Sequence, residues 1–138
     1  MDQEEFQEAF QEFQTIQQQM QALEEYSEEI TGEMEELDQT RDAVDEIAAS
    51  EEGDEVFFPL GQGAFAKGEI ADTDEVLVDV GADTYAEQDI DDAQELLDDR
   101  REELEDAMQR LQEQQQELKD RMQELQPKLQ KLQQAMQG

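Results

Sequence analysis

Two long stretches of the chain, one toward each end, repeat apolar residues at alternating spacings of three and four positions. In the first stretch, residues 6–48, we call Phe6 and every seventh residue after it position a, and Ala9 and every seventh residue after it position d. Both sets are apolar except at Ser27 and Arg41. In the second, residues 90–136, every d position from Ile90 to Leu132 is apolar. This is the period of a helix that packs along a narrow seam against another helix. The pattern therefore predicts two long helical arms.

The two arms have nearly the same length, roughly 65 to 70 Å each at about 1.5 Å per residue. If each helix paired with a separate molecule, the two helices would not need equal lengths. If the chain folds back on itself, equal lengths let the helices pair from end to end. We therefore predict an antiparallel two-helix coiled coil within one chain, in which the numbers of facing residues sum to about 138.

Between the arms, the apolar period shortens to two residues. Four short runs rich in Val, Phe, Leu and Tyr are predicted as strands, at residues 55–60, 64–70, 75–80 and 84–87. Glycine-containing turns at 61–63 and 81–83 join them into two hairpins. Because an isolated hairpin is marginal in water and its edges carry unpaired backbone groups, we expect these hairpins to pair with other chains.

The expected fold class is α+β, a long antiparallel two-helix coiled coil with two β-hairpins at the bend. Gly53 is expected to follow the end of the first helix, and Asp89 to cap the start of the second. Pro59 can donate no backbone hydrogen bond, which favours a sheet edge or a bulge there. The predicted domains are an N-terminal arm at 1–50, a double-hairpin assembly segment at 51–88 and a C-terminal arm at 89–138.

Charge narrows the range of partners. Lys and Arg total 9 against 41 Asp and Glu, a net charge of -32. Such a polyanion repels nucleic-acid phosphates and anionic membrane surfaces, so we expect neither as a partner. Acid in excess with little Lys is typical of a protein in concentrated salt, where the Debye length is only about 3 Å. An acidic coiled coil from an ordinary cell is the alternative.

The sequence lacks the features of an exported protein and of an enzyme. It shows neither a basic start followed by an apolar run nor a long apolar stretch, so we expect a soluble, cytoplasmic protein. There is no His or Cys, and Ser27 and Ser50 have no base nearby in sequence. Gly61–Gly63 precedes a strand, unlike a phosphate loop, and the acids at 72–75 fit no EF-hand. We expect no catalysis, cofactor or metal.

The segment between the arms carries recognisable motifs. Residues 59–65 read PLGQGAF, and residues 72–82 read DTDEVLVDVGA. Placed between two heptad arms, they resemble the alpha subunits of archaeal prefoldin, and two hairpins rather than one are typical of that type. With the acidic composition, the resemblance indicates a salt-adapted archaeon.

The resemblance implies an ATP-independent chaperone, a holdase that captures unfolded polypeptides at the coiled-coil tips and delivers them to a group II chaperonin. It also implies a hetero-hexamer of two alpha and four prefoldin beta subunits, in which hairpins of different subunits form β-barrels. A structural coiled-coil spacer or filament-forming protein without client capture is the alternative.

Two groups of side chains are expected to carry this function. Phenylalanines gather at the start of the first arm, and Phe10 lies off the seam. Pro127, inside the second helix, is expected to kink it and splay the arm ends. The predicted client-binding residues are Phe6, Phe10, Phe13, Ile16, Met20, Leu125, Leu129, Leu132 and Met136. The predicted subunit-assembly residues are Val56, Phe57, Phe58, Leu60, Phe65, Val76, Leu77, Val78, Val80 and Tyr85.

Several of these residues, and the charged residues of the arms, have a purely structural interpretation. The phenylalanines could merely close the end of the seam, and the methionines at a positions could be ordinary seam packing rather than adaptable client contacts. Arg41 and Arg101 at a positions are expected to set the register of the two helices. Ion pairs are expected across the distal arm, between Arg110, Lys119, Arg121, Lys128 or Lys131 on one helix and Glu4, Glu5, Glu8 or Glu12 on the other.

Overall fold

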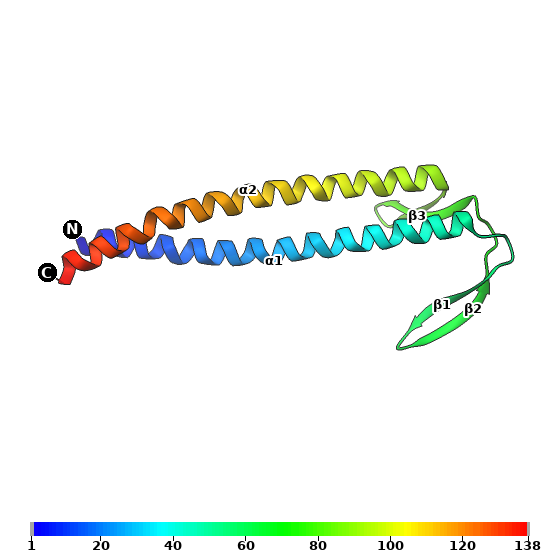
Figure 1. Cartoon of the computed structure of the whole chain (residues 1–138), viewed down its shortest axis with the longest axis horizontal. Helices are drawn as coiled ribbons and strands as arrows, with labels where there is room; N and C mark the ends of the chain where they lie inside the picture. The colour runs from blue at the N-terminus through cyan, green and yellow to red at the C-terminus, as the bar shows by residue number, and fades with distance from the viewer. Residues whose placement is uncertain (1, 138) are drawn as a thin grey trace. The chain divides into compact units, whose positions relative to one another are not determined.

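The computed structural model describes residues 2–137 (Figure 1), and its side chains are described from residue 3 onward. The element order confirms the predicted α+β class, with two long helices and two hairpins between them. Along the chain the elements are α1 (Asp2–Ala49), β1 (Glu55–Gly61), β2 (Ala64–Glu69), β3 (Glu75–Gly81), β4 (Thr84–Asp89) and α2 (Ile90–Gln137). No helix within the described residues combines the length and apolar character that a membrane span requires.

By its internal contacts the chain divides into two units, each holding a segment of both helices. The first unit comprises the described residues up to Glu33 together with those from Leu104 onward. The second comprises Met34–Glu103, and therefore contains both hairpins. The two units are described separately below.

In the first unit the two helices are held by the predicted apolar seam. Ala9 and Ile16 of α1 and Leu125 of α2 form a buried cluster. Partly buried seam residues pack against that cluster: Phe13, Met20, Leu118, Met122, Leu129 and Leu132. Ile30 and Leu111 are also buried. Because the start of α1 packs against the end of α2, the helices in this unit run antiparallel, as the heptad pattern predicted.

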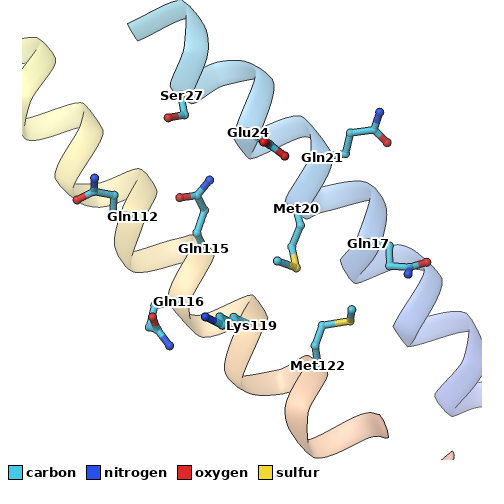
Figure 2. A pocket seen from close by; sticks show the side chains of 10 residues that line it. All are labelled: Gln17, Met20, Gln21, Glu24, Ser27, Gln112, Gln115, Gln116, Lys119 and Met122. Atoms are coloured by element: carbon cyan, nitrogen blue, oxygen red, sulfur yellow. The ribbon is translucent and has the colours of Figure 1, made fainter. Parts of the chain in front are cut away.

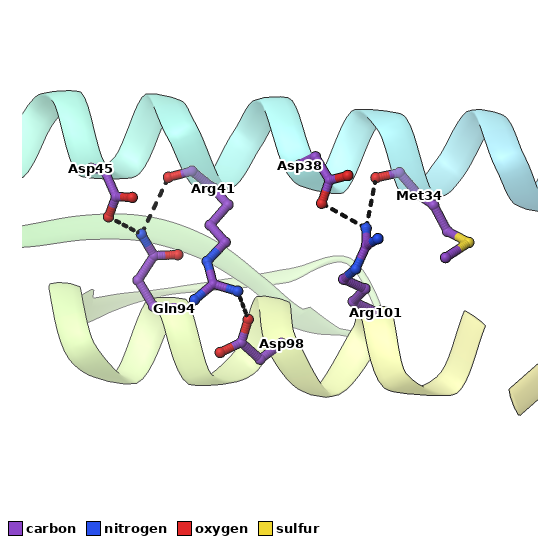
Figure 3. Close-up of polar contacts among 7 residues, drawn as sticks. All are labelled: Met34, Asp38, Arg41, Asp45, Gln94, Asp98 and Arg101. Carbon is purple, nitrogen blue, oxygen red and sulfur yellow. Dashed lines mark hydrogen bonds and ion pairs between the residues drawn. The ribbon is translucent and has the colours of Figure 1, made fainter. Parts of the chain in front are cut away.

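In the second unit the seam contains polar contacts between the helices as well as apolar ones (Figure 3). Val44 and Leu97 are buried. Arg101 Nη1 lies 2.6 Å from Asp38 Oδ1, and Arg41 forms an ion pair with Asp98. These pairs also run antiparallel, and their residue numbers sum close to the predicted value. The two arginines thus pair with acids on the opposite helix, which supports the role in register expected of them.

The hairpins are two separate antiparallel sheets, β1 with β2 and β3 with β4. Each register shifts beside the turn, between Pro59 and Gly61 in one and between Asp79 and Gly81 in the other. The bulge next to Pro59 agrees with the placement predicted for that proline. Gln62 and Gly63 both have positive φ, 52° and 79°, as a tight two-residue hairpin turn requires.

Strand boundaries differ from the prediction by one or two residues. β1 and β3 each include the glycine at the turn, because Gly61 pairs with Ala64 and Gly81 with Thr84. β2 ends at Glu69 rather than at residue 70, and β4 extends to Asp89, which pairs with Glu75. The apolar pattern located the strands, whereas backbone pairing sets where they end.

Capping at the helix ends agrees with the sequence. The carboxylate of Asp89 accepts a hydrogen bond from the backbone N–H of Asp92 at 2.8 Å, which confirms Asp89 as the cap of α2. Beyond the end of α1, Gly53 has a φ of 91° and donates its backbone N–H to the carbonyl of Ile70 at 2.8 Å. The chain therefore leaves α1 through a conformation that favours glycine.

The structure differs from the expectation that Pro127 splays the arm ends. α2 continues as a helix through Pro127 to Gln137. Leu125, two residues earlier, is only 1% exposed, and Leu129 and Leu132 remain packed against the seam. Gln123, whose carbonyl loses its helical partner, is an exposed residue. Packing on both sides of the proline thus keeps the seam closed.

Candidate functional site

An aromatic pair occupies the start of α1. The rings of Phe6 and Phe10 stack with centroids 6.0 Å apart and planes within 10°. This pairing follows from their spacing, because residues four apart are neighbours on a helix surface. Phe6 is half-buried and Phe10 is 43% exposed. The off-seam phenylalanine therefore has one ring face covered by its neighbour, while much of its surface remains open to solvent.

The predicted client-binding residues fall into three classes of exposure. Phe10 and Met136 are exposed. Ile16 and Leu125 are buried in the seam, so they support the tip and cannot touch another molecule while the seam is closed. The others are half-buried: Phe6, Phe13, Met20, Leu129 and Leu132. The tip thus presents a small exposed apolar surface above a packed seam.

One ion pair joins the helices near the tip. Arg121 donates from Nε to Glu12 Oε1 at 2.6 Å and from Nη2 to Glu12 Oε2 at 3.0 Å, and it also binds Glu124. The hydrogen bond from Arg121 lowers the pKa of Glu12, and the two carboxylates raise the pKa of Arg121. Of the cross-helix ion pairs predicted for the distal arm, Arg121 with Glu12 is the one that the structure shows among the described residues.

The Arg121–Glu12 pair predicts a pH-dependent effect on stability. Because the folded pKa of Glu12 is lowered, the pair stabilises the protein above the ordinary glutamate pKa of about 4.3, and this stabilisation is lost as the pH falls through the folded pKa. Arg121→Gln should lower the Tm by a few degrees at most at neutral pH, since the pair is exposed. Thermal melts at neutral and acid pH should show this difference vanishing in acid. Lys131→Gln, with the same charge change, is the control, and equal pH profiles would contradict the prediction.

A groove lies along the seam in the middle of the first unit (Figure 2). Ser27 and Gln115, both polar residues at a positions, line it together with Met20 and Met122. The hydroxyl of Ser27 approaches the sulfur of Met108 at 3.7 Å, a weak contact. Of these four lining residues, only Met20 was predicted to belong to a site, although the two polar a residues could have indicated a gap in the seam. The groove marks a stretch of seam that is incompletely filled with apolar side chains.

Filling this stretch should stabilise the arm. Gln115→Leu replaces a half-buried amide by an apolar side chain, and we expect a gain of about 1 kcal/mol in the free energy of unfolding. Denaturant titration followed by circular dichroism at 222 nm measures it. Gln109→Leu, at an exposed position on the same helix, is the matched control and should leave stability nearly unchanged. A loss of stability with Gln115→Leu would show that the glutamine is needed in the seam.

The hairpins expose much of their apolar surface. The side chains of Phe57, Phe65 and Tyr85 are each 62% exposed, and Leu77 is 66% exposed. Phe58, Leu60 and Val80 are also exposed. Only Val56, Val76 and Val78 of the predicted assembly residues are half-buried. Exposed apolar surface of this kind is typical of sites where proteins contact other molecules.

The second hairpin is tied to α2. Arg100 of α2 donates a hydrogen bond to the backbone carbonyl of Asp79, near the turn of the hairpin. At the other end, the N–H of Ile90 donates to the carbonyl of Asp74 at 3.1 Å. Leu96 and Val80 line a shallow pocket between helix and hairpin. The sequence carried no indication of the Arg100 contact, because a basic residue among acids on a helix has many possible partners.

Within the first hairpin, two side-chain arrangements are local. The ring of Phe58 lies over Gly68, so close that a Cβ there would come within 2.2 Å of a ring carbon. On the other face, the ammonium of Lys67 lies 5.9 Å from the centre of the Phe57 ring. Both aromatic rings of β1 thus rest on the paired strand. The described residues contain no cluster of three or more His, Cys, Asp or Glu able to hold a metal ion.

A family model described as prefoldin subunit matches residues 16–135, which include both hairpins and most of each helix. The chain belongs to the prefoldin family. The resemblance inferred from the motifs at 59–65 and 72–82 is thereby confirmed.

Curated prefoldin alpha subunits are among its relatives. The protein from Halorubrum lacusprofundi is 37% identical over 68 residues, which are 49% of this chain and 45% of that protein. The protein from Haloquadratum walsbyi is 43% identical over 61 residues, 44% of this chain and 40% of that protein. The matched stretch therefore spans less than half the length of these prefoldin relatives.

Solved prefoldin structures share the fold. A filamentous PFD from Methanocaldococcus jannaschii has a TM-score of 0.78 at 20% identity, and the match covers 86% of this chain and 98% of that one. The prefoldin beta subunit from Thermococcus strain KS-1 has a TM-score of 0.58 at 20% identity, with 92% and 90% covered. At this level of identity the comparison shows a common fold.

Proposed function

We propose that this chain is an alpha-type prefoldin subunit that works as an ATP-independent chaperone. In this proposal it captures unfolded polypeptides at the ends of its helices and delivers them to a group II chaperonin in the cytoplasm. The observation that carries it is the stacked Phe6–Phe10 pair, which leaves Phe10 exposed beside the closed seam. No catalytic residue, cofactor or metal has a part in it.

Client capture rests on apolar contact by several weak sites. Burying one phenylalanine ring is worth about 1.5 to 3 kcal/mol, which alone binds an unfolded chain weakly. Several subunits acting on the same client multiply this through effective concentration. In the closed form of the tip, Phe10 and Met136 supply the exposed contact, and Phe6, Phe13, Met20, Leu129 and Leu132 widen it. Ile16 and Leu125 hold the two helices beneath.

Assembly is assigned to the hairpins, in the proposed segment 51–88. Two prefoldin alpha and four beta subunits would join through β-barrels built from hairpins of different chains. The exposed residues Phe57, Phe58, Leu60, Phe65, Leu77, Val80 and Tyr85, with the half-buried Val56, Val76 and Val78, support this assignment. Native mass measurement after mixing with candidate beta subunits tests it, and a chain that stays alone with every candidate would contradict it.

The test of the chaperone function is whether the assembled protein keeps a chemically denatured client soluble without ATP. We expect light scattering of the diluted client to fall as the assembly is added, and to stay low without nucleotide. Equal scattering with and without the assembly would contradict the proposal.

A filament-forming role is the second candidate. The filamentous PFD from Methanocaldococcus jannaschii shares the fold over 98% of its length. A filament of this chain would require its copies to pair with one another through both hairpins. Electron microscopy of the chain alone, over a range of salt, distinguishes the two functions, because open-ended fibres are expected only in the second.

A further inference from the structure

The two hairpins are copies of one pattern. Glu55, Val56, Gly61 and Ala66 recur as the same residue types at positions 75, 76, 81 and 86. The backbone pairings recur with the same offset, so that Glu55 with Glu69 corresponds to Glu75 with Asp89. The register shift also lies at the equivalent place in both. Each position of the first hairpin therefore has a counterpart in the second.

One face of each hairpin has an apolar centre exposed to solvent. Residues paired directly across an antiparallel ladder lie on the same face, and alternate residues along a strand share that face. In the first hairpin, this face holds Glu55, Phe57, Pro59, Phe65, Lys67 and Glu69. In the second hairpin, it holds Glu75, Leu77, Asp79, Tyr85, Glu87 and Asp89. We call these the first and second outer faces.

The two outer faces differ in charge. Where the first has Pro59 and Lys67, the second has Asp79 and Glu87. The second outer face thus carries four acidic side chains and no basic one, whereas the first carries two acids and Lys67. The nearby base is Arg100, whose guanidinium binds the backbone carbonyl of Asp79.

Within the single chain, Glu75 of the second outer face is repelled by neighbouring acids, chiefly by Glu87. Repulsion and hydrogen bonding from Glu87, with smaller contributions from Asp72 and Asp89, raise the pKa of Glu75. In the described part of the chain, the ion pairs found involve none of Glu75, Asp79, Glu87 and Asp89. A partner that brought more carboxylates to this face would add to the repulsion, and one that brought basic side chains would relieve it.

We propose that the second outer face binds a strand bearing Lys or Arg from a different subunit and rejects a second copy of itself. This inference rests on the proposed function as an assembling subunit, and it states the chemistry of the partner. Charge complementarity selects this partner. Lys67 is the only basic residue between positions 55 and 89, so another copy of this hairpin segment supplies little positive charge. Like charges juxtaposed across an interface are a general means of excluding the wrong partner.

The test isolates the second outer face. In the full chain, Phe57→Ser with Phe65→Ser removes the apolar centre of the first outer face. In this background, chains with the native second outer face are compared with chains that also carry Glu87→Lys. Sedimentation velocity of each chain alone, and of the two mixed, measures association at about 0.15 M salt, where the Debye length is about 8 Å, and at about 1 M.

We expect the Glu87→Lys chain and the chain with the native second outer face to bind each other at least tenfold more tightly than the latter binds a second copy of itself. We also expect this preference to shrink at about 1 M salt, because screening weakens both repulsion and attraction. Equal association in all mixtures at both salt concentrations would overturn the inference. Circular dichroism confirms that the chains are folded, and Glu87→Gln, a milder change, should show a smaller shift in the same direction if Glu87→Lys fails to fold.

Failure of this inference would be distinct from failure of the proposed function. If charge had no effect but Leu77→Ser with Tyr85→Ser abolished association with a beta subunit, the face would still serve assembly without selecting for charge. The chaperone function itself is tested separately, by measuring whether the assembled protein keeps a denatured client soluble.

Discussion

Phe57→Ser combined with Phe65→Ser is expected to weaken strongly the association of this chain with other prefoldin subunits, because it removes the apolar centre of the first outer face. The two rings lie on the same face of the first hairpin and are each 62% exposed in the single chain. Burying each ring in an interface contributes about 1.5 to 3 kcal/mol. Loss of both should therefore weaken association by at least about 100-fold, since 1.4 kcal/mol corresponds to a factor of ten.

The measurement is native mass spectrometry of mixtures with a beta subunit that assembles with the unmodified chain. Circular dichroism should be nearly unchanged, because neither ring belongs to the buried clusters of the helices. Phe10→Ser serves as a matched control, since it also removes an exposed phenylalanine but leaves the hairpins intact. If the hairpin variant assembled as well as this control, the first outer face would have no part in assembly.

Phe10→Ser combined with Met136→Ser should raise the concentration of assembled protein needed for half-maximal suppression of client aggregation by at least about tenfold. Both side chains are exposed, so serine there costs the fold little, while each loses apolar area that a client would cover. The effect grows with the number of tips that hold one client, because weak contacts combine through effective concentration.

Tyr26→Ser is the control for this variant. Tyr26 is an aromatic residue of the same helix, 49% exposed, and lies outside the predicted client-binding set. Native mass should show that all the variants assemble. If the tip variant and the Tyr26 variant suppressed aggregation equally well, the tip would not be the client surface.

The sequence predicted the architecture because the features that determine it are local and repeated. The heptad spacing placed Ile16 and Leu125 on the seam, and both are buried. Glycines at positions 61 and 63 marked the first hairpin turn, where positive φ is required. Asp89 had the residue type and position of a helix cap, and its carboxylate accepts the expected bond. Each of these depends on a few neighbouring residues.

The features that the sequence did not predict depend on competition between distant parts of the chain. A proline in a helix interior costs about 3 kcal/mol, which favoured an open tip, but burial of Leu125 and Leu129 on either side of Pro127 opposes opening. By contrast, the stacking of Phe10 on Phe6 is local, and it was not predicted because the heptad pattern describes only the seam and Phe10 lies off it. The contact from Arg100 to the carbonyl of Asp79 joins residues whose proximity only the folded hairpin creates.

The hydrogen bonds around the hairpins indicate how a partner would meet each one. The second hairpin is fastened to α2 at two points, through Asp74 with Ile90 and through Asp79 with Arg100. Among the described residues, the hydrogen bonds that tie the first hairpin to its surroundings lie at its base, where Ile70 bonds to Gly53 and Asp54. Force applied to the second hairpin would therefore reach α2 both at the base of the hairpin and near its turn, whereas force applied to the first hairpin would reach the segment after α1 through the base of that hairpin.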